Sequence, residues 1–494
     1  QASESTPDGL AGAAFVKDVA GVGFGGGSRK PLLTGPAALA DAAGYSLDDI
    51  EMETSQARDR ERNARFDLQH DGRLAGMDLE LKFGAKTSRR TKTNEQETWV
   101  FKAKDLAKAP LNLTKAQLAM GQFLDGTAVD YPWGTFGPAL SASALRNLVA
   151  PLDRSKFREE EDSRVNDFRI EEQVDAAYLQ AKLELSDKTQ LLGGLRHERL
   201  SMTAQGTGIN EGEFESVAVT TRSHHWLPAL LVRHDLGQDT LVRAALTHSL
   251  VRPSFGQLAP GFVIDGDEAE FGNPALKPLR SRNLDLGIER RLARDGAVSA
   301  YVFHKRIRDF VYRTDLAGTG KWTDFDSALT YANGEAAKLS GLELSYNQAL
   351  RMLPGPWNGL ILGANATLVH SSASVSGFKD GQPQSRRLAL PSQSKRSVNL
   401  SLGWEGRGFG TRLALNHKSA YLLEVGDVLD AAKDQWVDAQ TQVDFSLRYD
   451  ISPKLAISFE ALNLNDSKYY VYAGRRALNS QYEQYGRSYK IGLK

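Results

Sequence analysis

Cysteine is absent from the 494 residues, which excludes disulfide frameworks, thiolate metal sites and cysteine nucleophiles. Long apolar runs are absent too. The longest, such as residues 227–232, fall far short of the roughly 18 residues that a membrane-spanning helix needs. A helical membrane protein is therefore excluded. A transmembrane β-barrel is not excluded, because only every second residue of its strands meets lipid.

An excess of either charge is also lacking, since 61 Lys and Arg residues balance 61 Asp and Glu residues. Nucleic acid is a poor partner for such a chain, because binding it draws on an excess of cations. Residues 1–10 do not show the basic and then apolar pattern of a signal peptide. We expect any export signal to have been removed or to lie upstream of Gln1.

What the chain does have is a strict alternation of apolar and polar residues, which residues 437–450 show best. Successive side chains of a strand point to opposite faces, so this pattern predicts a strand with one apolar and one polar face. No helical pattern fits it. The apolar positions of this segment are Val437, Ala439, Val443, Phe445, Leu447 and Tyr449.

Alternation alone fits either a soluble sandwich or a membrane barrel. The lengths of the connections favour the barrel. Short turns near residues 451–453 and 406–407 alternate with long connections near 424–435 and 371–391, and a further long connection is expected near 204–213. Outer-membrane barrels have tight turns on one side and long loops on the other. The sequence therefore predicts an all-β, antiparallel transmembrane β-barrel.

We count about fifteen strands in this pattern, beginning near residue 63 and ending near residue 493. A bacterial single-chain barrel normally has an even number of strands, with both termini in the periplasm. If the last strand runs inward, an odd count leaves residues 1–60 as an extracellular, loop-like segment. Residues 61–494 are then the C-terminal part of a larger barrel.

Several stretches resemble the TonB-dependent outer-membrane receptors. Residues 463–465 (Asn-Leu-Asn) and 481–493 are similar to the last hairpin of that family. Residues 252–254 (Arg-Pro-Ser) and 272–274 (Gly-Asn-Pro) are similar to its mid-barrel extracellular loop. Residues 390–403 resemble a branch that is common in environmental proteobacteria. These motifs are fairly specific in combination, and upstream of Arg252 the support is the alternation alone.

The resemblance implies a barrel of 22 strands occluded by an N-terminal plug. The fifteen strands expected here are then the last fifteen, and the plug domain and the TonB box are absent from this chain. The usual terminal aromatic residue is also missing after Lys494.

The implied location is the cell outer membrane of a Gram-negative bacterium. The implied partners are the inner-membrane TonB complex, acting through a plug not present in this chain, and outer-membrane lipid. The resemblance also implies a small-molecule ligand and, as a further partner, a separate N-terminal chain or a surface lipoprotein.

The resemblance further implies TonB-driven uptake of a bulky, scarce solute, either an oligosaccharide or a ferric siderophore. A passive, porin-like channel is the alternative. We expect no enzyme activity, because no nucleophile, base and orienting residue stand at a recognisable spacing. We also expect no cofactor and no catalytic or metal site.

Aromatic side chains in the expected loops are the candidate ligand-binding residues, since they can stack on a sugar or a chelate. Packing of long loops against one another explains them equally well. These candidates are Trp99, Tyr131, Trp133, Phe136 and Trp322.

Three other features are expected to be structural. His224 and His225 are adjacent and so point to opposite faces of a strand, which prevents them from chelating one metal ion. The acidic residues 159–162 are expected in a solvated loop. Tyr469 and Tyr470 are expected in an aromatic girdle at the membrane interface.

Overall fold

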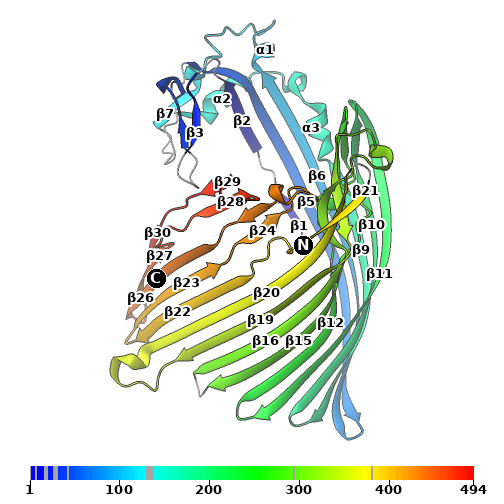
Figure 1. Cartoon of the computed structure of the whole chain (residues 1–494), viewed down its shortest axis with the longest axis vertical. Coiled ribbons are helices and arrows are strands. Elements are labelled where there is room, and N and C mark those ends of the chain that lie inside the picture. The colour runs from blue at the N-terminus through cyan, green and yellow to red at the C-terminus, as the bar shows by residue number, and fades with distance from the viewer. Residues whose placement is uncertain are drawn as a thin grey trace.

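The computed structural model is a long, curved antiparallel sheet with folded loops gathered at one of its ends (Figure 1). No helix in the described part of the chain is long and apolar enough to cross a membrane. The residues that the structure describes are 2–5, 8–15, 20–25, 32–39, 41, 44–128, 138–292, 295–379 and 382–494.

The wall consists of fifteen strands in the described part of the chain, each paired antiparallel with the next. This confirms the all-β barrel class and the expected number of strands. In order, the wall strands are β5 (Ser46–Leu74), β6 (Met77–Lys102), β9 (Phe168–Ser186), β10 (Thr189–Asn210), β11 (Glu213–Gly237), β12 (Thr240–Val251), β15 (Leu279–Leu292), β16 (Gly296–Arg308), β19 (Ala337–Ala349), β20 (Leu360–Lys379), β22 (Arg396–Gly406), β23 (Phe409–Lys418), β26 (Gln440–Ser452), β27 (Leu455–Leu462) and β30 (Ser488–Leu493).

One end of the wall has tight turns. Residues 75–76, 238–239 and 407–408 each form a two-residue turn between neighbouring strands. The φ angles of all six turn residues are positive. Positive φ at both central positions is the geometry whose twist matches that of the flanking strands. The opposite end carries the long connections, as the alternation of loop lengths predicts.

One of the expected long loops is not a loop. Residues 204–213 continue the β10–β11 ladder, and only Glu211 and Gly212 form the turn, with φ angles of 50° and 79°. The expectation was wrong because the apolar alternation fades where neither face of the hairpin meets lipid. Backbone pairing does not depend on that alternation and continues beyond it.

The cross-strand register places the apolar positions of neighbouring strands on the same face of the wall. Leu246 pairs with Leu284, and Leu286 pairs with Val302. Residues that pair across a ladder share a face. Leu246 is 54% exposed although it is large and apolar. A continuous face of exposed apolar side chains is the surface that a barrel presents to lipid.

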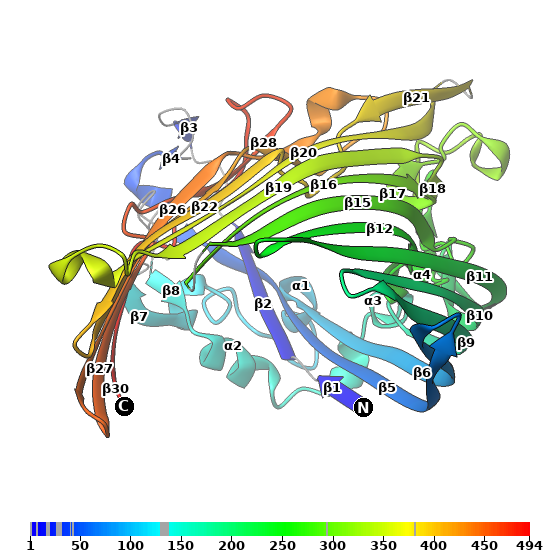
Figure 2. The same cartoon turned by 90° about the horizontal axis from the view of Figure 1, so that it is seen from below.

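The wall does not close on itself in the described part of the chain. Among the residues that the structure describes, β30 pairs with β27 alone, and the far edge of β5 pairs only with β1 (Ala2–Ser5) and β2 (Asp8–Phe15). Figure 2 shows the resulting arch. The first wall strand begins at Ser46, inside the range 1–60 that the sequence assigned to a loop-like segment. The division of the chain at residue 60 otherwise stays a prediction.

The apolar cores lie among the loops, not inside the wall. The largest core contains Leu47, Ile50, Phe101, Leu106 and Val149, all nearly inaccessible to solvent. The loop elements are β3 (Gly23–Gly25), β4 (Leu32–Thr34), η1 (Ala37–Leu39), α1 (Ala103–Leu106), η3 (Met120–Phe123), β7 (Leu124–Ala128), β8 (Pro138–Leu140), α2 (Ala142–Val149), η4 (Arg154–Phe157), α3 (Glu160–Val165), α4 (Phe255–Leu258), β13 (Phe262–Asp265), β14 (Glu268–Phe271), β17 (Phe310–Asp315), η5 (Gly320–Trp322), β18 (Ser327–Gly334), β21 (Gln382–Leu388), β24 (Tyr421–Glu424), η7 (Ala431–Lys433), β25 (Gln435–Val437), β28 (Tyr469–Ala473) and β29 (Asn479–Glu483). The remaining short helix, η6 (Gly355–Gly359), lies in the β19–β20 connection at the end with the tight turns.

Candidate ligand-binding site

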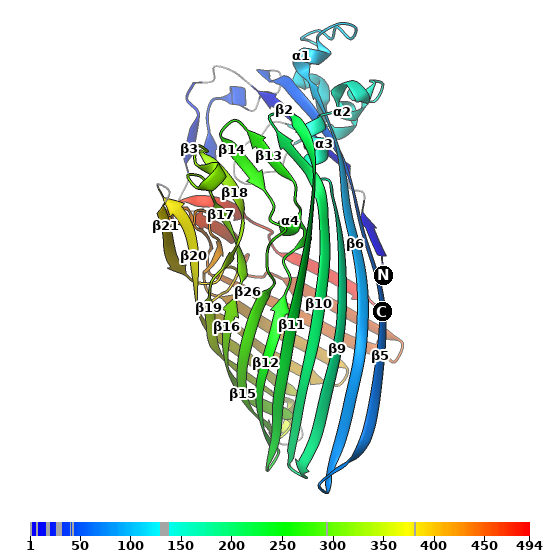
Figure 3. The ribbon, with the colours of Figure 1, turned by 90° about the vertical axis from the view of Figure 1, so that its right-hand side faces the viewer.

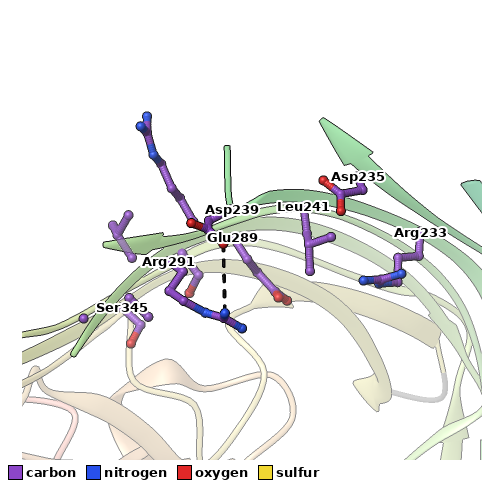
Figure 4. Close-up of a pocket in the computed structure, with 12 residues that line it drawn as sticks. Arg233, Asp235, Asp239, Leu241, Glu289, Arg291 and Ser345 are labelled. Carbon is purple, nitrogen blue, oxygen red and sulfur yellow. Dashed lines mark ion pairs between the residues drawn. The ribbon is translucent and has the colours of Figure 1, made fainter. Parts of the chain in front are cut away.

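The concave face of the wall is polar. Figure 4 shows Arg233, Glu289 and Arg291 beneath the arch of the sheet, near the end with the tight turns. They line a hollow of about 620 Å³, and Arg291 lies 3.9 Å from Asp239 across it. Charged side chains of both signs therefore face the bore at this depth.

Further charged side chains of the wall lie on this face. Leu413 pairs with Phe445 on the convex face, so the adjacent residues Arg412 and Asp444 point to the concave face. The same register places four more charged residues on the concave side: Glu405, Lys418, Arg448 and Glu460.

A cluster of ion pairs lies higher on the concave face, where the loop that follows β12 begins. Arg252 donates a hydrogen bond from Nη2 to Glu198 Oε2 at 2.6 Å, and its Nε lies 3.7 Å from Glu172 Oε2. Arg196 pairs with Glu198 at 2.8 Å. Two carboxylates and two guanidiniums thus neutralise one another on the inner wall.

Phe255, in the same loop, forms a cation–π contact with Arg90 of β6. The guanidinium carbon of Arg90 lies 4.8 Å from the ring centroid of Phe255, and Arg90 Nε donates to Asp59 at 2.8 Å. Residues 252–255 therefore attach the 252–278 loop to β6 and β10. This cluster shapes the mouth of the bore, and most of its charges are already paired.

Trp322 is a packing residue in the structure. Only 6% of it is exposed, and its ring stacks on Phe271 at 4.8 Å and meets Phe325 edge-on at 4.9 Å. Lys321 Nζ covers the ring at 4.2 Å. The ring is enclosed by Phe325 and Lys321 of its own loop and by Phe271 of the loop between β12 and β15, so little of it is accessible to a ligand.

Trp99 belongs to a different part of the loop region. It lies in β6 and is partly buried against the core around Ile50 and Phe101, with the guanidinium carbon of Arg154 at 5.6 Å from its ring. The structure therefore does not bring Trp99 and Trp322 together. Tyr131, Trp133 and Phe136 lie outside the described residues. A ligand-binding role for these five aromatic residues stays a prediction.

Two residues of the acidic segment 159–162 form ion pairs with basic residues of the chain, and residues 160–162 lie in α3. Glu160 pairs with Arg158 and Arg164, and Glu159 pairs with Lys102 at 3.3 Å. No group of three or more metal-ligating side chains is found in the part of the chain that the structure describes.

Tyr469 and Tyr470 do not lie in the barrel wall. Tyr469 and Tyr470 belong to β28, which pairs with β25 and β29 in a small sheet among the loops. Tyr470 is only 3% exposed. Their assignment to an aromatic girdle was wrong, because the last hairpin leaves the ladder after Leu462 and folds into this sheet.

Sequence reasoning missed the ion pairs that hold the loops together. Arg386 of β21 pairs with Asp434, and Arg476 pairs with Asp438 at 2.6 Å. The members of each pair are far apart in the chain, so no local spacing could reveal them.

The carboxyl of Asp167, in the loop before β9, has a raised pKa. Asp167 accepts a hydrogen bond from the backbone N–H of Gln96 at 2.7 Å. Burial raises the pKa of Asp167, and the nearby carboxylates of Glu95 and Glu97 act in the same direction.

An antiparallel wall with an apolar convex face, a charged concave face and folded loops at one end defines a transmembrane β-barrel wall. The sequence matches the family described as TonB dependent receptor-like, beta-barrel over residues 8–464, and the chain belongs to that family. TonB-dependent receptors are outer-membrane proteins that bind small molecules and interact with TonB. No curated protein sequence matches the chain.

Solved structures share the fold at low sequence identity. The ferric-catecholate import receptor Fiu from E. coli K12 is 13% identical with a TM-score of 0.59, and the match covers 100% of this chain and 60% of Fiu. The siderophore receptor PiuA from Acinetobacter baumannii is 13% identical with a TM-score of 0.59, covering 91% of this chain and 63% of PiuA. The chain thus spans roughly three fifths of the length of these receptors, and the likeness concerns the fold alone.

Proposed function

We propose that this protein takes up a bulky, scarce solute across the outer membrane as the barrel part of a TonB-driven receptor. The observation that carries the proposal is the division between the two faces of the wall. The convex face is apolar and exposed, whereas the concave face carries charges of both signs. A polar solute can pass along the concave face while lipid covers the other face.

The folded loops at one end support capture of the solute from outside. They have apolar cores of their own and are attached to the wall by ion pairs such as Arg252–Glu198. A loop cap of fixed shape can select a ligand before it enters the bore. Release would follow when the inner-membrane TonB complex pulls on a plug, and binding rather than catalysis is the chemistry.

We propose an oligosaccharide or a ferric siderophore as the solute. Both are large and rich in oxygen, and both suit a bore lined by guanidinium and carboxylate groups. Fiu is a ferric-catecholate import receptor and PiuA is a siderophore receptor. Their low identity to this chain leaves the choice to experiment.

A deletion strain tests the proposal. We expect slower growth than the parent either on one oligosaccharide as the carbon source or under iron limitation, and a tonB deletion should produce the same defect. Normal growth in every arm would contradict uptake. Single-channel conductance of the full-length protein separates the passive channel, which would give a large steady current, from a gated receptor.

A further inference from the structure

The wall parts between two of its strands. The ladder between β11 and β12 ends at the pair Ala229–Thr247, next to Pro228, which has no backbone N–H to donate. Beyond this point the described residues of β11 pair only with β10, whereas β12 stays paired with β15 as far as Val251. Figure 3 shows β11 running on beside β10 above this point.

A hollow of about 470 Å³ lies at the foot of this split. Trp226, Pro228 and His248 line it, and Trp226 is 61% exposed. The ring of His197 lies 4.3 Å from that of Trp226 and also stacks on His224 at 5.6 Å. The hollow therefore has an aromatic side that is open to the surroundings.

Its other side is strongly basic. Arg282 is the cross-strand partner of Arg306, and Arg280 is the partner of Arg308. All four line the hollow, and Arg306 also faces Lys338 across the β16–β19 ladder. Like charges directly opposite one another destabilise a sheet. An anion bound beside these arginines would offset their mutual repulsion.

The chain supplies only one such anion among its described residues. Arg280 pairs with Asp309 at 2.6 Å. Within that same part of the chain, Arg282, Arg306 and Arg308 have no ion pair or side-chain hydrogen bond, and all three are exposed. The remaining positive charge is therefore free to meet an external anion.

These arginines lie on the lipid-facing side of the wall. Arg282 shares one face of β15 with Leu284 and Leu286, and Glu289, which lies beneath the arch, is on the other face. Arg306 follows Val302 in the same way on β16. Both arginines stand where the apolar band ends on the side of the loops, which is the depth of lipid headgroups in the outer leaflet.

We propose that this hollow binds the phosphate groups of a lipid in the outer leaflet of the membrane. Guanidinium groups suit phosphate because they donate two parallel hydrogen bonds to its oxygens. The exposed ring of Trp226 offers an apolar surface to the sugar ring or acyl chain that carries the phosphate. The inference goes beyond solute uptake and requires only that the wall lies in the membrane.

Native mass spectrometry of the full chain in a non-ionic detergent tests the site. The probes are a bisphosphorylated glycolipid, the same lipid without phosphate, and inorganic phosphate. The test variant is Arg282→Gln with Arg306→Gln. Its matched control is Arg62→Gln with Arg89→Gln, because those arginines are also cross-strand partners on the convex face. Circular dichroism shows whether each variant keeps its β-structure.

We expect the parent protein to prefer the phosphorylated lipid over the dephosphorylated one. The test variant should bind it about tenfold more weakly or worse, and the control should lose less than twofold. Equal losses in both variants would overturn the proposal in favour of a diffuse basic belt. Equal binding of the two lipids would also overturn it, as would inorganic phosphate that displaces the lipid at similar concentration. Growth with the transported solute is a separate readout, so failure of this inference would be distinguishable from failure of the uptake proposal.

Discussion

The guanidinium of Arg386 forms a two-pronged ion pair with the buried carboxylate of Asp434, with Nη1–Oδ2 and Nη2–Oδ1 distances of 2.7 and 2.9 Å. The same guanidinium donates to the backbone carbonyls of Val428 and Asp427. Asp434 has only 4% of its side chain exposed. One side chain of β21 thus holds the loop between β23 and β26 in place.

Arg386→Met should loosen that loop. The variant leaves the Asp434 carboxylate buried without its partner, and losing one member of a buried pair costs about 3–5 kcal/mol. We expect faster hydrogen exchange across residues 419–439, measured by mass spectrometry. Lys433→Gln is the control, because Lys433 is exposed and an exposed ion pair such as Lys433–Asp427 contributes little to stability. Equal exchange in both variants would show that Arg386 has no anchoring role.

The raised pKa of Asp167 predicts a pH effect in the loop before β9. A carboxyl whose pKa is higher in the folded than in the unfolded state destabilises the fold when ionised. That penalty is present at neutral pH and is relieved as the pH falls through the folded-state pKa. We therefore expect the amides of this loop to gain protection as the medium is acidified, after correction for intrinsic exchange. Asp167→Asn should remove the trend, and a trend that persists in it would exclude Asp167 as the source.

Trp322→Ala should destabilise the loop that contains β17 and β18. Removing a large buried ring from between Phe271 and Phe325 leaves a cavity, for which the usual cost is about 3–5 kcal/mol. Limited proteolysis should then cut this loop sooner, and Trp322→Phe should retain most of the protection. If Trp322→Ala resists cleavage as the parent does, packing of the Trp322 ring does not stabilise this loop. That result would instead support the prediction that Trp322 contacts a ligand.

Gly341→Ala should impair formation of the wall. A Cβ at this position would collide with the ring of Phe303 and with the backbone oxygen of Leu368. Backbone on the adjacent strand cannot move aside cheaply, and overpacking of this kind costs about 1–3 kcal/mol. We expect a lower midpoint in thermal unfolding in detergent. Gly193→Ala is the control, since its Cβ would lie 3.8 Å from Leu230, and a similar shift in both would contradict the steric argument.

The wall could be predicted from the sequence because its signal is local. Of residues 437–450, those from Gln440 onward lie in the wall strand β26, where polar and apolar side chains alternate between the two faces. This two-residue period needs no knowledge of distant residues. The number of wall strands, their two faces and the alternation of short and long connections all follow from that period. The family motifs near both Arg252 and Asn463 are equally local.

The structure of the loops could not be predicted in the same way, because it depends on contacts between residues that are distant in sequence. Arg386 meets Asp434, and Arg282 meets Arg306, only once the strands are aligned in their final register. Trp322 and Tyr470 are aromatic residues in expected surface segments, yet neighbours from other parts of the chain bury them. Alternation along the chain thus determined which face of each strand meets lipid. Only the tertiary structure decided which side chains meet one another, because pairing across a sheet joins residues whose separation in sequence carries no local pattern.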